Sequence, residues 1–177
     1  MPTPSAAELT DLVDDLAIRR VLYRYCRGID RLDLEMVRAC YHPDATDDHG
    51  DYSGGVDGFL EYVRGARAVY QSTMHTLGNI LIEIDGDVAR SEAYALAQHR
   101  IPPRGRHPHR DNWVGLRYID RFERRDDRQW RIAERICVYE WTRTDPVEPG
   151  WTFTDGFLRG VSGPSDPLYQ IAVPPPH

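Results

Sequence analysis

The spacing of apolar residues changes near residue 72, and this change constrains the fold more than any other feature of the sequence. Before that point apolar side chains recur every three or four residues, and after it they alternate with polar ones. The first spacing predicts amphipathic helices, whereas alternation predicts strands with one buried face. The chain is therefore expected to form its helices first and an antiparallel sheet second, which defines an α+β fold.

Three helices are predicted before the change. The first begins at a capping box headed by Ser5 and is expected to end at Gly28, a residue type common at helix ends. A short second helix is predicted over residues 34–41 and a third over residues 56–70, with a short strand near residues 45–49 between them.

Two β-hairpins are predicted after the change. The first turns at Asp85-Gly86, a dipeptide that favours a tight turn, and the second turns around residues 125–128. Prolines keep the loop over residues 102–111 out of the sheet. We expect a cone-shaped, curved antiparallel sheet wrapped over three N-terminal helices and enclosing one pocket, because small-molecule pockets form in such cavities.

The tail differs in composition from the rest of the chain. After Asp145 it is rich in proline and glycine, residues that favour irregular surface structure. We therefore expect an α+β cone domain over residues 1–145. An arm over residues 146–177 would follow it and serve as a lid or a subunit contact.

Composition and charge exclude several classes of function. The 177 residues carry a formal net charge of −6, whereas a nucleic-acid-binding surface needs a clustered positive field. The sequence shows no signal peptide, and no apolar run approaches the roughly 20 residues that span a bilayer. The three cysteines are far apart and match neither a disulfide framework nor a zinc site. We expect a cytoplasmic protein with no nucleic-acid or membrane partner.

Four polar residues occupy positions where an apolar core is expected to close. Tyr25 lies on the apolar stripe of the first helix, and Asp30 follows the expected end of that helix. His75 opens a strand face that alternation continues through Leu81. Arg135 alternates with apolar and aromatic residues on the last predicted strand, where its charge requires a partner.

These four residues indicate acid–base chemistry if they meet in one pocket. Asp30 would fix the tautomer of His75 and raise the basicity of its other nitrogen. Tyr25 and Arg135 would then donate hydrogen bonds to a departing or developing oxyanion. Each residue also has a structural explanation: a packed strand histidine for His75, a cap or turn for Asp30, a core aromatic for Tyr25, and an ion pair with Glu134 or Glu140 for Arg135.

The chain resembles the SnoaL-like branch of the nuclear-transport-factor-2-like superfamily in three stretches, YRYCRGIDRLDLEMVRACYHPDA, HTLGN and RFERRDDRQWRIAER. More narrowly, it resembles scytalone dehydratase, bile acid 7α-dehydratase and hexachlorocyclohexane dehydrochlorinase over most of residues 8–142. The resemblance implies that Asp30 and His75 form the aspartate–histidine pair of that family. It also implies that Tyr25 is a further active-site group and that Arg135 completes a dehydratase-type site.

The resemblance further implies a second pocket histidine at His99. That residue ends a strand face of small residues, which leave room for a ligand or a helix. The remaining candidates for a substrate-binding wall are aromatic, and packing explains each of them equally well: Trp113, Tyr118, Tyr139 and Trp141.

A metal site is an alternative for the loop between the hairpins. His107, His109 and Asp111 are residue types that bind metals, but no fourth ligand accompanies them at a recognisable spacing. The sequence has no glycine-rich phosphate loop and no nucleotide fingerprint. We therefore expect no metal and no cofactor.

Together these features favour a cofactor-independent lyase of the dehydratase type, acting on a small hydrophobic substrate of alicyclic, steroid-like or polyketide-like kind. His75 would remove a proton next to a carbonyl, and Asp30 would stabilise the resulting imidazolium. An isomerase or cyclase that uses the same base remains an alternative, as does a non-catalytic ligand-binding or assembly module. The resemblance also implies a homodimer or homotrimer.

Overall fold

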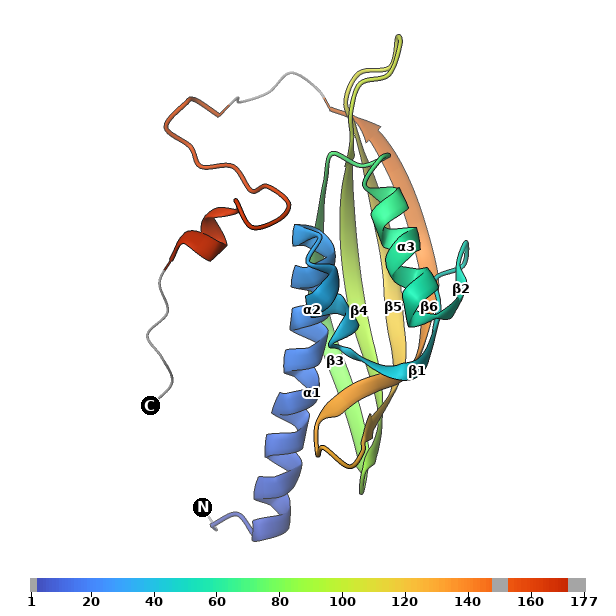
Figure 1. Ribbon diagram of the computed structural model, residues 1–177, viewed down its shortest axis with the longest axis vertical. Coiled ribbons are helices and arrows are strands. Elements are labelled where there is room, and N and C mark those ends of the chain that lie inside the picture. Colours follow the sequence, from blue (N-terminus) through green and yellow to red (C-terminus); the bar gives the residue numbers. More distant parts are fainter. Residues whose placement is uncertain (1–2, 148–152, 172–177) are drawn as a thin grey trace.

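The computed structural model describes residues 3–147 and 153–171, which form three helices against one face of a curved six-stranded sheet (Figure 1). The elements are α1 (Ala6–Arg31), α2 (Leu34–Arg38), β1 (Tyr41–Asp48), β2 (Ser53–Gly55), α3 (Val56–Ala66), β3 (Ser72–Asp85), β4 (Val88–Ile101), β5 (Arg110–Arg124), β6 (Trp130–Pro146) and a 3₁₀ helix, η1 (Pro167–Gln170). The strand order is β2-β1-β6-β5-β4-β3. This architecture confirms the predicted α+β cone.

Both predicted hairpins are present, and the strand near residue 45 is longer than expected. β3 and β4 meet at the Asp85-Gly86 turn, and β5 and β6 pair across their whole length. The short predicted strand is part of β1, which lies parallel to β6 and pairs with the short edge strand β2. The sheet is therefore mixed rather than wholly antiparallel.

The end of α1 differs from the prediction. The helix begins at the predicted capping box, but it continues past Gly28 to Arg31 and ends at Leu32, whose φ of 55° is left-handed. Gly28 has another role, because a Cβ atom added there would lie only 2.7 Å from Cγ2 of Val37 on α2. The glycine lets the two helices approach, and Asp30 lies in the last turn of α1 rather than beyond it.

A bulge in β3 reverses which side chains face inward. Leu77 pairs with Ala95 and Ile80 with Ala93, so β3 has one more residue than β4 between these pairs. Because side chains alternate along a strand, one added residue moves every later side chain to the other face. Ile80 therefore continues the inward face of Leu77, and Leu81 is 63% exposed. The predicted face running from His75 through Leu81 is wrong beyond this bulge.

A second bulge lies between β5 and β6. Leu116 pairs with Tyr139, but Gly115 pairs with Trp141, so β6 has one extra residue there. Trp141 thereby turns to the opposite face from Tyr139 and covers Gly115, whose missing Cβ leaves room for the indole. Trp141 is half exposed on the outer side of the sheet.

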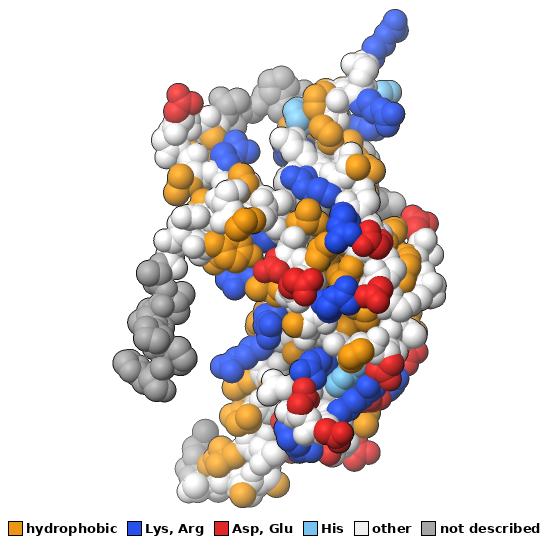
Figure 2. All heavy atoms as spheres, in the orientation of Figure 1, with side chains coloured by type: hydrophobic (Ala, Val, Ile, Leu, Met, Phe, Trp, Pro, Cys, Tyr) orange, Lys and Arg blue, Asp and Glu red, His pale blue; other side chains and the backbone are white. Residues whose placement is uncertain are grey.

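The core lies between the helices and the inner face of the sheet. Ile18 and Leu22 of α1 and Phe59 of α3 pack there against buried strand residues such as Phe122 and Ile132. The first turns of α1 extend beyond the sheet (Figure 1), and hydrophobic side chains remain exposed there (Figure 2). Among the described helices, none combines the length and hydropathy required to cross a membrane.

The described part of the tail lies beside the C-terminal end of α1 (Figure 1). Arg31 forms an ion pair with Asp166 at 3.4 Å, and its carbonyl accepts a hydrogen bond from the backbone N–H of Gly163 at 2.7 Å. The Tyr169 hydroxyl donates to Asp33 at 3.4 Å. The division into a domain over residues 1–145 and an arm over residues 146–177 stays a prediction.

Candidate active site

A cavity of about 470 Å³ opens between α1, α3 and the inner faces of β3–β6. Its size is that of pockets that bind small molecules. Part of its wall is apolar, with Phe59 and Val63 from α3 and Val114 and Leu116 from β5. The polar groups that matter most for chemistry are Tyr25, Asp30, His49, His75, His99 and Tyr139. Such a mixture suits a largely hydrophobic ligand with a few polar atoms.

Asp30 and His75 form a buried pair at this cavity. Oδ1 of Asp30 lies 2.7 Å from Nδ1 of His75, and Oδ2 accepts the backbone N–H of His75 at 2.9 Å. The Thr73 hydroxyl donates to Oδ1 at 2.9 Å. The two paired side chains are only 9% and 8% exposed. The last turn of α1 and the start of β3 thus fix both the position and the rotation of the imidazole.

The environment of Asp30 keeps its carboxylate ionised. Burial disfavours the charged form, but hydrogen bonds from His75 and Thr73 outweigh that effect and hold the pKa of Asp30 below its ordinary value. An ionised carboxylate accepts a hydrogen bond from the N–H at Nδ1 of the ring, so Nε2 of the neutral imidazole has the lone pair. That arrangement is the one required of a general base.

His99, on the neighbouring strand β4, lies beside His75 at the cavity wall. The rings of His75 and His99 are perpendicular with centroids 5.7 Å apart, and Tyr70 packs on His99 at 4.6 Å. Burial, together with the nearby His75, lowers the pKa of His99 to about 4. Its buried Nδ1 atom has no hydrogen-bond partner in the described residues. His99 is therefore neutral near pH 7.

The structure brings Tyr25 to the cavity but places Arg135 behind the cavity wall. Arg135 is 1% exposed and binds both carboxylate oxygens of Asp120 at 2.7 Å. Its guanidinium lies under the rings of Tyr25 and Tyr118, at 4.0 and 4.3 Å from their centroids. The partner of Arg135 is therefore Asp120, directly opposite it on the neighbouring strand β5, and not Glu134 or Glu140, the alternatives considered from the sequence.

Burial raises the pKa of Tyr25 well above its ordinary value, although the charge of Arg135 opposes this rise. The Tyr25 hydroxyl therefore stays protonated and can donate a hydrogen bond. Of the predicted aromatic wall residues, Tyr118 and Tyr139 line the cavity. Trp113 and Trp141 are not among its lining residues.

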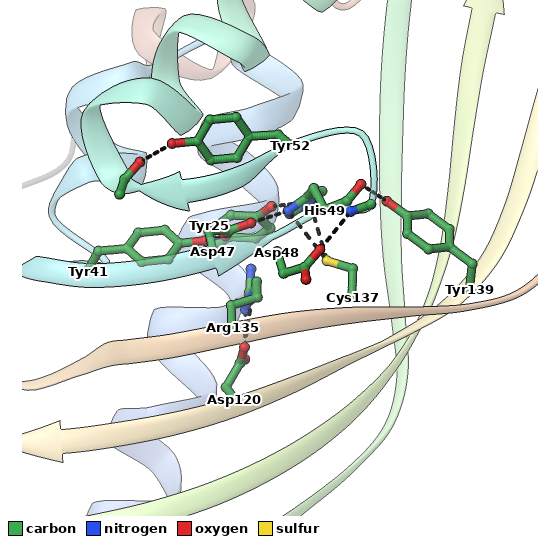
Figure 3. A network of polar contacts seen from close by, with 12 residues as sticks. Tyr25, Tyr41, Asp47, Asp48, His49, Tyr52, Asp120, Arg135, Cys137 and Tyr139 are labelled. Carbon is green, nitrogen blue, oxygen red and sulfur yellow. Dashed lines mark hydrogen bonds and ion pairs between the residues drawn. The ribbon is translucent and has the colours of Figure 1, made fainter.

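A polar network at the other end of the cavity was not predicted from the sequence (Figure 3). Asp47 of β1 binds Nδ1 of His49, and Nε2 of His49 lies 3.3 Å from the Tyr25 hydroxyl. The Tyr139 hydroxyl donates to the backbone carbonyl of His49 at 2.9 Å. The sequence predicts a short strand near residues 45–49, but its surroundings are rich in turn-forming residues, and neither Asp47 nor His49 was singled out from the sequence. A useful signal was the alternation of Ala45, Asp47 and His49 along one strand face.

The loop considered as a metal site has other interactions. Asp111 forms an ion pair with Arg100 through two contacts, one of them 2.9 Å long. The backbone of His107 pairs with that of Arg104 in a tight turn. Within residues 3–147 and 153–171, no three histidine, cysteine or acidic side chains are grouped so that they could hold a metal ion.

The fold and its cavity define a cone-shaped α+β protein of the nuclear-transport-factor-2-like kind. The chain belongs to the SnoaL-like domain family, whose sequence profile matches residues 10–136. The resemblance inferred from three short stretches is thereby confirmed.

Individual relatives agree with this assignment. The protein Rv2910c of Mycobacterium tuberculosis H37Rv is 30% identical over 146 residues, which cover 75% of this chain and 89% of that protein. A Novosphingobium aromaticivorans DSM 12444 protein, described provisionally as a scytalone dehydratase, superimposes with a TM-score of 0.67 at 22% identity, covering 85% and 98% of the two chains. The hexachlorocyclohexane dehydrochlorinase LinA-type3 of Novosphingobium barchaimii LL02 gives 0.69 at 17% identity, covering 82% and 97%. At these identities the two structural matches show the fold.

Proposed function

We propose that this protein is a lyase that eliminates water, or a comparable leaving group, from a small alicyclic, steroid-like or polyketide-like ketone. The proposal rests on one observation, the buried contact of 2.7 Å between Asp30 and His75 at the wall of a cavity of ligand size. The reaction would need no cofactor, because proton removal and departure of the leaving group are both acid–base steps.

In this mechanism Nε2 of His75 removes a proton from the carbon next to the carbonyl. Asp30 stabilises the imidazolium that forms, since its carboxylate stays ionised and bound to Nδ1. A base held in this way contributes roughly 10²–10⁴-fold to the rate. The same step would also begin an isomerisation, which remains the alternative reaction at this site.

The other polar groups have complementary roles in the proposal. Tyr25, which stays protonated, donates to the oxygen that leaves. Neutral His99, beside His75, lines the part of the cavity that would hold the carbonyl group of the substrate. Arg135 acts only through Tyr25, because that ring and the ring of Tyr118 cover its guanidinium. Its positive charge makes the Tyr25 hydroxyl a better hydrogen-bond donor than burial alone would allow.

The first test is proton exchange into a bicyclic ketone, decalin-2-one, dissolved in heavy water and followed by NMR. A base at His75 exchanges the protons next to the carbonyl whether the natural reaction is an elimination or an isomerisation. We expect the wild type to accelerate exchange and the His75→Ala variant to lose roughly 10²–10⁴-fold of that acceleration. The His107→Ala variant, altered in the exposed loop, is the control and should match the wild type.

The second test separates the candidate functions. The wild type is expected to convert 4-hydroxydecalin-2-one to the conjugated enone, which is detected by its ultraviolet absorption. If the wild type instead only moves the double bond of a β,γ-unsaturated decalenone into conjugation, the isomerase alternative replaces the lyase. Binding of decalin-2-one without proton exchange would contradict both and favour a non-catalytic binding module.

Assembly into a homodimer or homotrimer stays a prediction. The outer sheet face has half-exposed aromatic side chains, Tyr94 and Trp141, beside the ion pairs of Arg117 with Glu92 and Glu140. Light scattering after gel filtration would measure the mass directly. A monomer at micromolar concentration would contradict this prediction and leave the proposed chemistry unaffected.

A further inference from the structure

A second histidine–carboxylate pair lies at the cavity wall, and it has no role in the proton removal proposed for His75. Nδ1 of His49, just after β1, binds Oδ1 of Asp47 (Figure 3). The Tyr41 hydroxyl donates to the other oxygen of Asp47 at 2.6 Å. The Asp47 side chain is 0% exposed and that of His49 is 14% exposed. The carboxylate is therefore sealed in the core, while the imidazole lines the cavity.

The pair connects directly to the proposed donor of the first site. Nε2 of His49 lies 3.3 Å from the Tyr25 hydroxyl, so the order of contacts is Asp47, His49, Tyr25. Because Asp47 accepts a hydrogen bond from the N–H at Nδ1, Nε2 accepts a hydrogen bond from Tyr25 when the ring is neutral. When the ring is an imidazolium, Nε2 donates to Tyr25 instead. A proton on His49 can therefore reach the cavity through the tyrosine hydroxyl.

The buried groups around Tyr25 have an excess of negative charge, which a positively charged imidazole ring would balance. Asp47, Asp120 and Arg135 are each 1% exposed, and Arg135 is bound to Asp120 on both carboxylate oxygens. These three groups have a formal charge of −1 in total. The imidazolium form of His49 brings the formal charge of the cluster to zero, which removes the penalty of an uncompensated buried carboxylate.

Other groups around His49 come from three further elements. The ring packs on Phe59 of α3 at 4.7 Å and faces Tyr118 of β5 at 6.4 Å. Sγ of Cys137 on β6 lies 3.4 Å from Nε2, and burial raises the pKa of that thiol, so it stays neutral. The Tyr139 hydroxyl binds the backbone carbonyl rather than the ring. Asp47 is thus the group that holds the ring by charge.

A single helix holds the two histidine pairs apart. Tyr25 contacts His49, and Asp30 contacts His75, and both residues are on α1. Five residues of α-helix separate them by about 7.5 Å along the axis. At one end of the cavity the base His75 is in contact with a carboxylate. At the other end Tyr25 is in contact with His49, which is itself bound to a carboxylate.

We propose that His49 is the proton source behind Tyr25, and that the substrate is consequently a β-hydroxy ketone rather than a β-halo ketone. This inference rests on the proposed function. His75 takes the proton from the carbon next to the carbonyl, and that C–H electron pair forms the new C=C bond. The C–O bond breaks as its oxygen takes the Tyr25 proton and leaves as water, while Tyr25 takes the proton of His49. Afterwards His75 is protonated and His49 neutral, and exchange with solvent restores both.

The test compares two leaving groups that differ in their need for a proton. Hydroxide must be protonated to leave, whereas chloride leaves as a stable anion. The substrates are 4-hydroxydecalin-2-one and 4-chlorodecalin-2-one, which give the same enone, with the spontaneous rate subtracted. The His49→Gln variant is expected to lose about 100-fold in water elimination and less than about threefold in chloride elimination. The Tyr25→Phe variant, which keeps the ring and loses only the hydroxyl, should show the same split.

The controls separate this inference from the function on which it rests. His42→Gln removes another buried histidine of β1, whose ring binds the carbonyl of Glu123 outside the cavity, and should change neither rate. His75→Ala should lower both rates. If His49→Gln and Tyr25→Phe slow the elimination of water and of chloride equally, or slow neither, the role of His49 is overturned. The proposed lyase activity would stand in that case. A wild type that eliminates neither group would overturn the lyase and this inference together.

Discussion

The guanidinium carbon of Arg135 lies 4.0 Å from the centre of the Tyr25 ring, while two nitrogens of the same group bind Asp120 at 2.7 Å. The ring therefore lies between the cation and the cavity, and the carboxylate fixes the cation in place. Arg135 affects a bound molecule through the Tyr25 hydroxyl rather than by touching it. A buried ion pair of this kind also has a consequence for stability.

Removing one partner of that pair is expected to be far more costly than removing both. The Arg135→Met variant leaves Asp120 buried and unpaired, so we expect the free energy of unfolding to fall by about 3–5 kcal/mol. The double variant with Asp120→Leu replaces both charges by apolar groups and should recover most of that loss. Urea denaturation measures both values. A single variant as stable as the double variant would contradict the ion-pair interpretation.

The stability of the protein should fall in acid partly because of Asp30. Its pKa in the folded state lies below the ordinary value of 3.8, so the unfolded chain binds this proton more readily than the folded one does. The resulting stabilisation is present above the ordinary value and is lost as the pH falls through the folded value. Asp30→Asn should therefore lose less stability between about pH 6 and pH 3 than the wild type does. Thermal unfolding across this range is the measurement, with the exposed Asp155→Asn as the control.

Gly28 should resist replacement by alanine, although alanine normally favours helices. An added Cβ would lie 2.7 Å from Cγ2 of Val37, so we expect Gly28→Ala to destabilise the protein by about 1–3 kcal/mol. Gly65 in α3 is the matched control, because a Cβ there would meet nothing within 4 Å. Gly65→Ala should be neutral or stabilising by up to about 1 kcal/mol. Equal effects at the two glycines in denaturant titrations would refute the packing argument.

Asp166 is expected to hold the described part of the tail against α1. Its carboxylate binds Arg31 and accepts the backbone N–H groups of Val161 and Leu168 at 2.9 and 3.0 Å. Asp166→Ala removes all three contacts, so amide exchange across residues 153–171 should become faster, while exchange in β3–β6 should not change. Hydrogen exchange by mass spectrometry gives both readings. Unchanged exchange in the tail would show that other contacts hold it.

The periodicity of the sequence was sufficient to predict the order of the three helices, the two hairpins and the cone, but not the short edge strand β2. It was also sufficient to single out Asp30 and His75, because both are polar residues beside otherwise apolar faces, and the structure places them in contact. The bulges were not predictable, since one extra residue leaves the composition of a strand unchanged while it reverses the faces beyond it.

Two further features depend on which strands are neighbours, and alternation along one strand does not contain that information. The partner of Arg135 is Asp120 because β5 and β6 pair in a particular register. The strand that contains Asp47 was predicted, but which strands and helices lie beside it, and hence the contact of His49 with Tyr25, was not. In both cases the missing information was tertiary rather than local.

The position of Tyr25 and Asp30 on one continuous helix has a consequence for motion. A helix changes length very little, so these two residues keep a nearly constant separation along its axis. The residue that contacts His75 and the residue that contacts His49 therefore stay at one spacing even if the sheet around them moves.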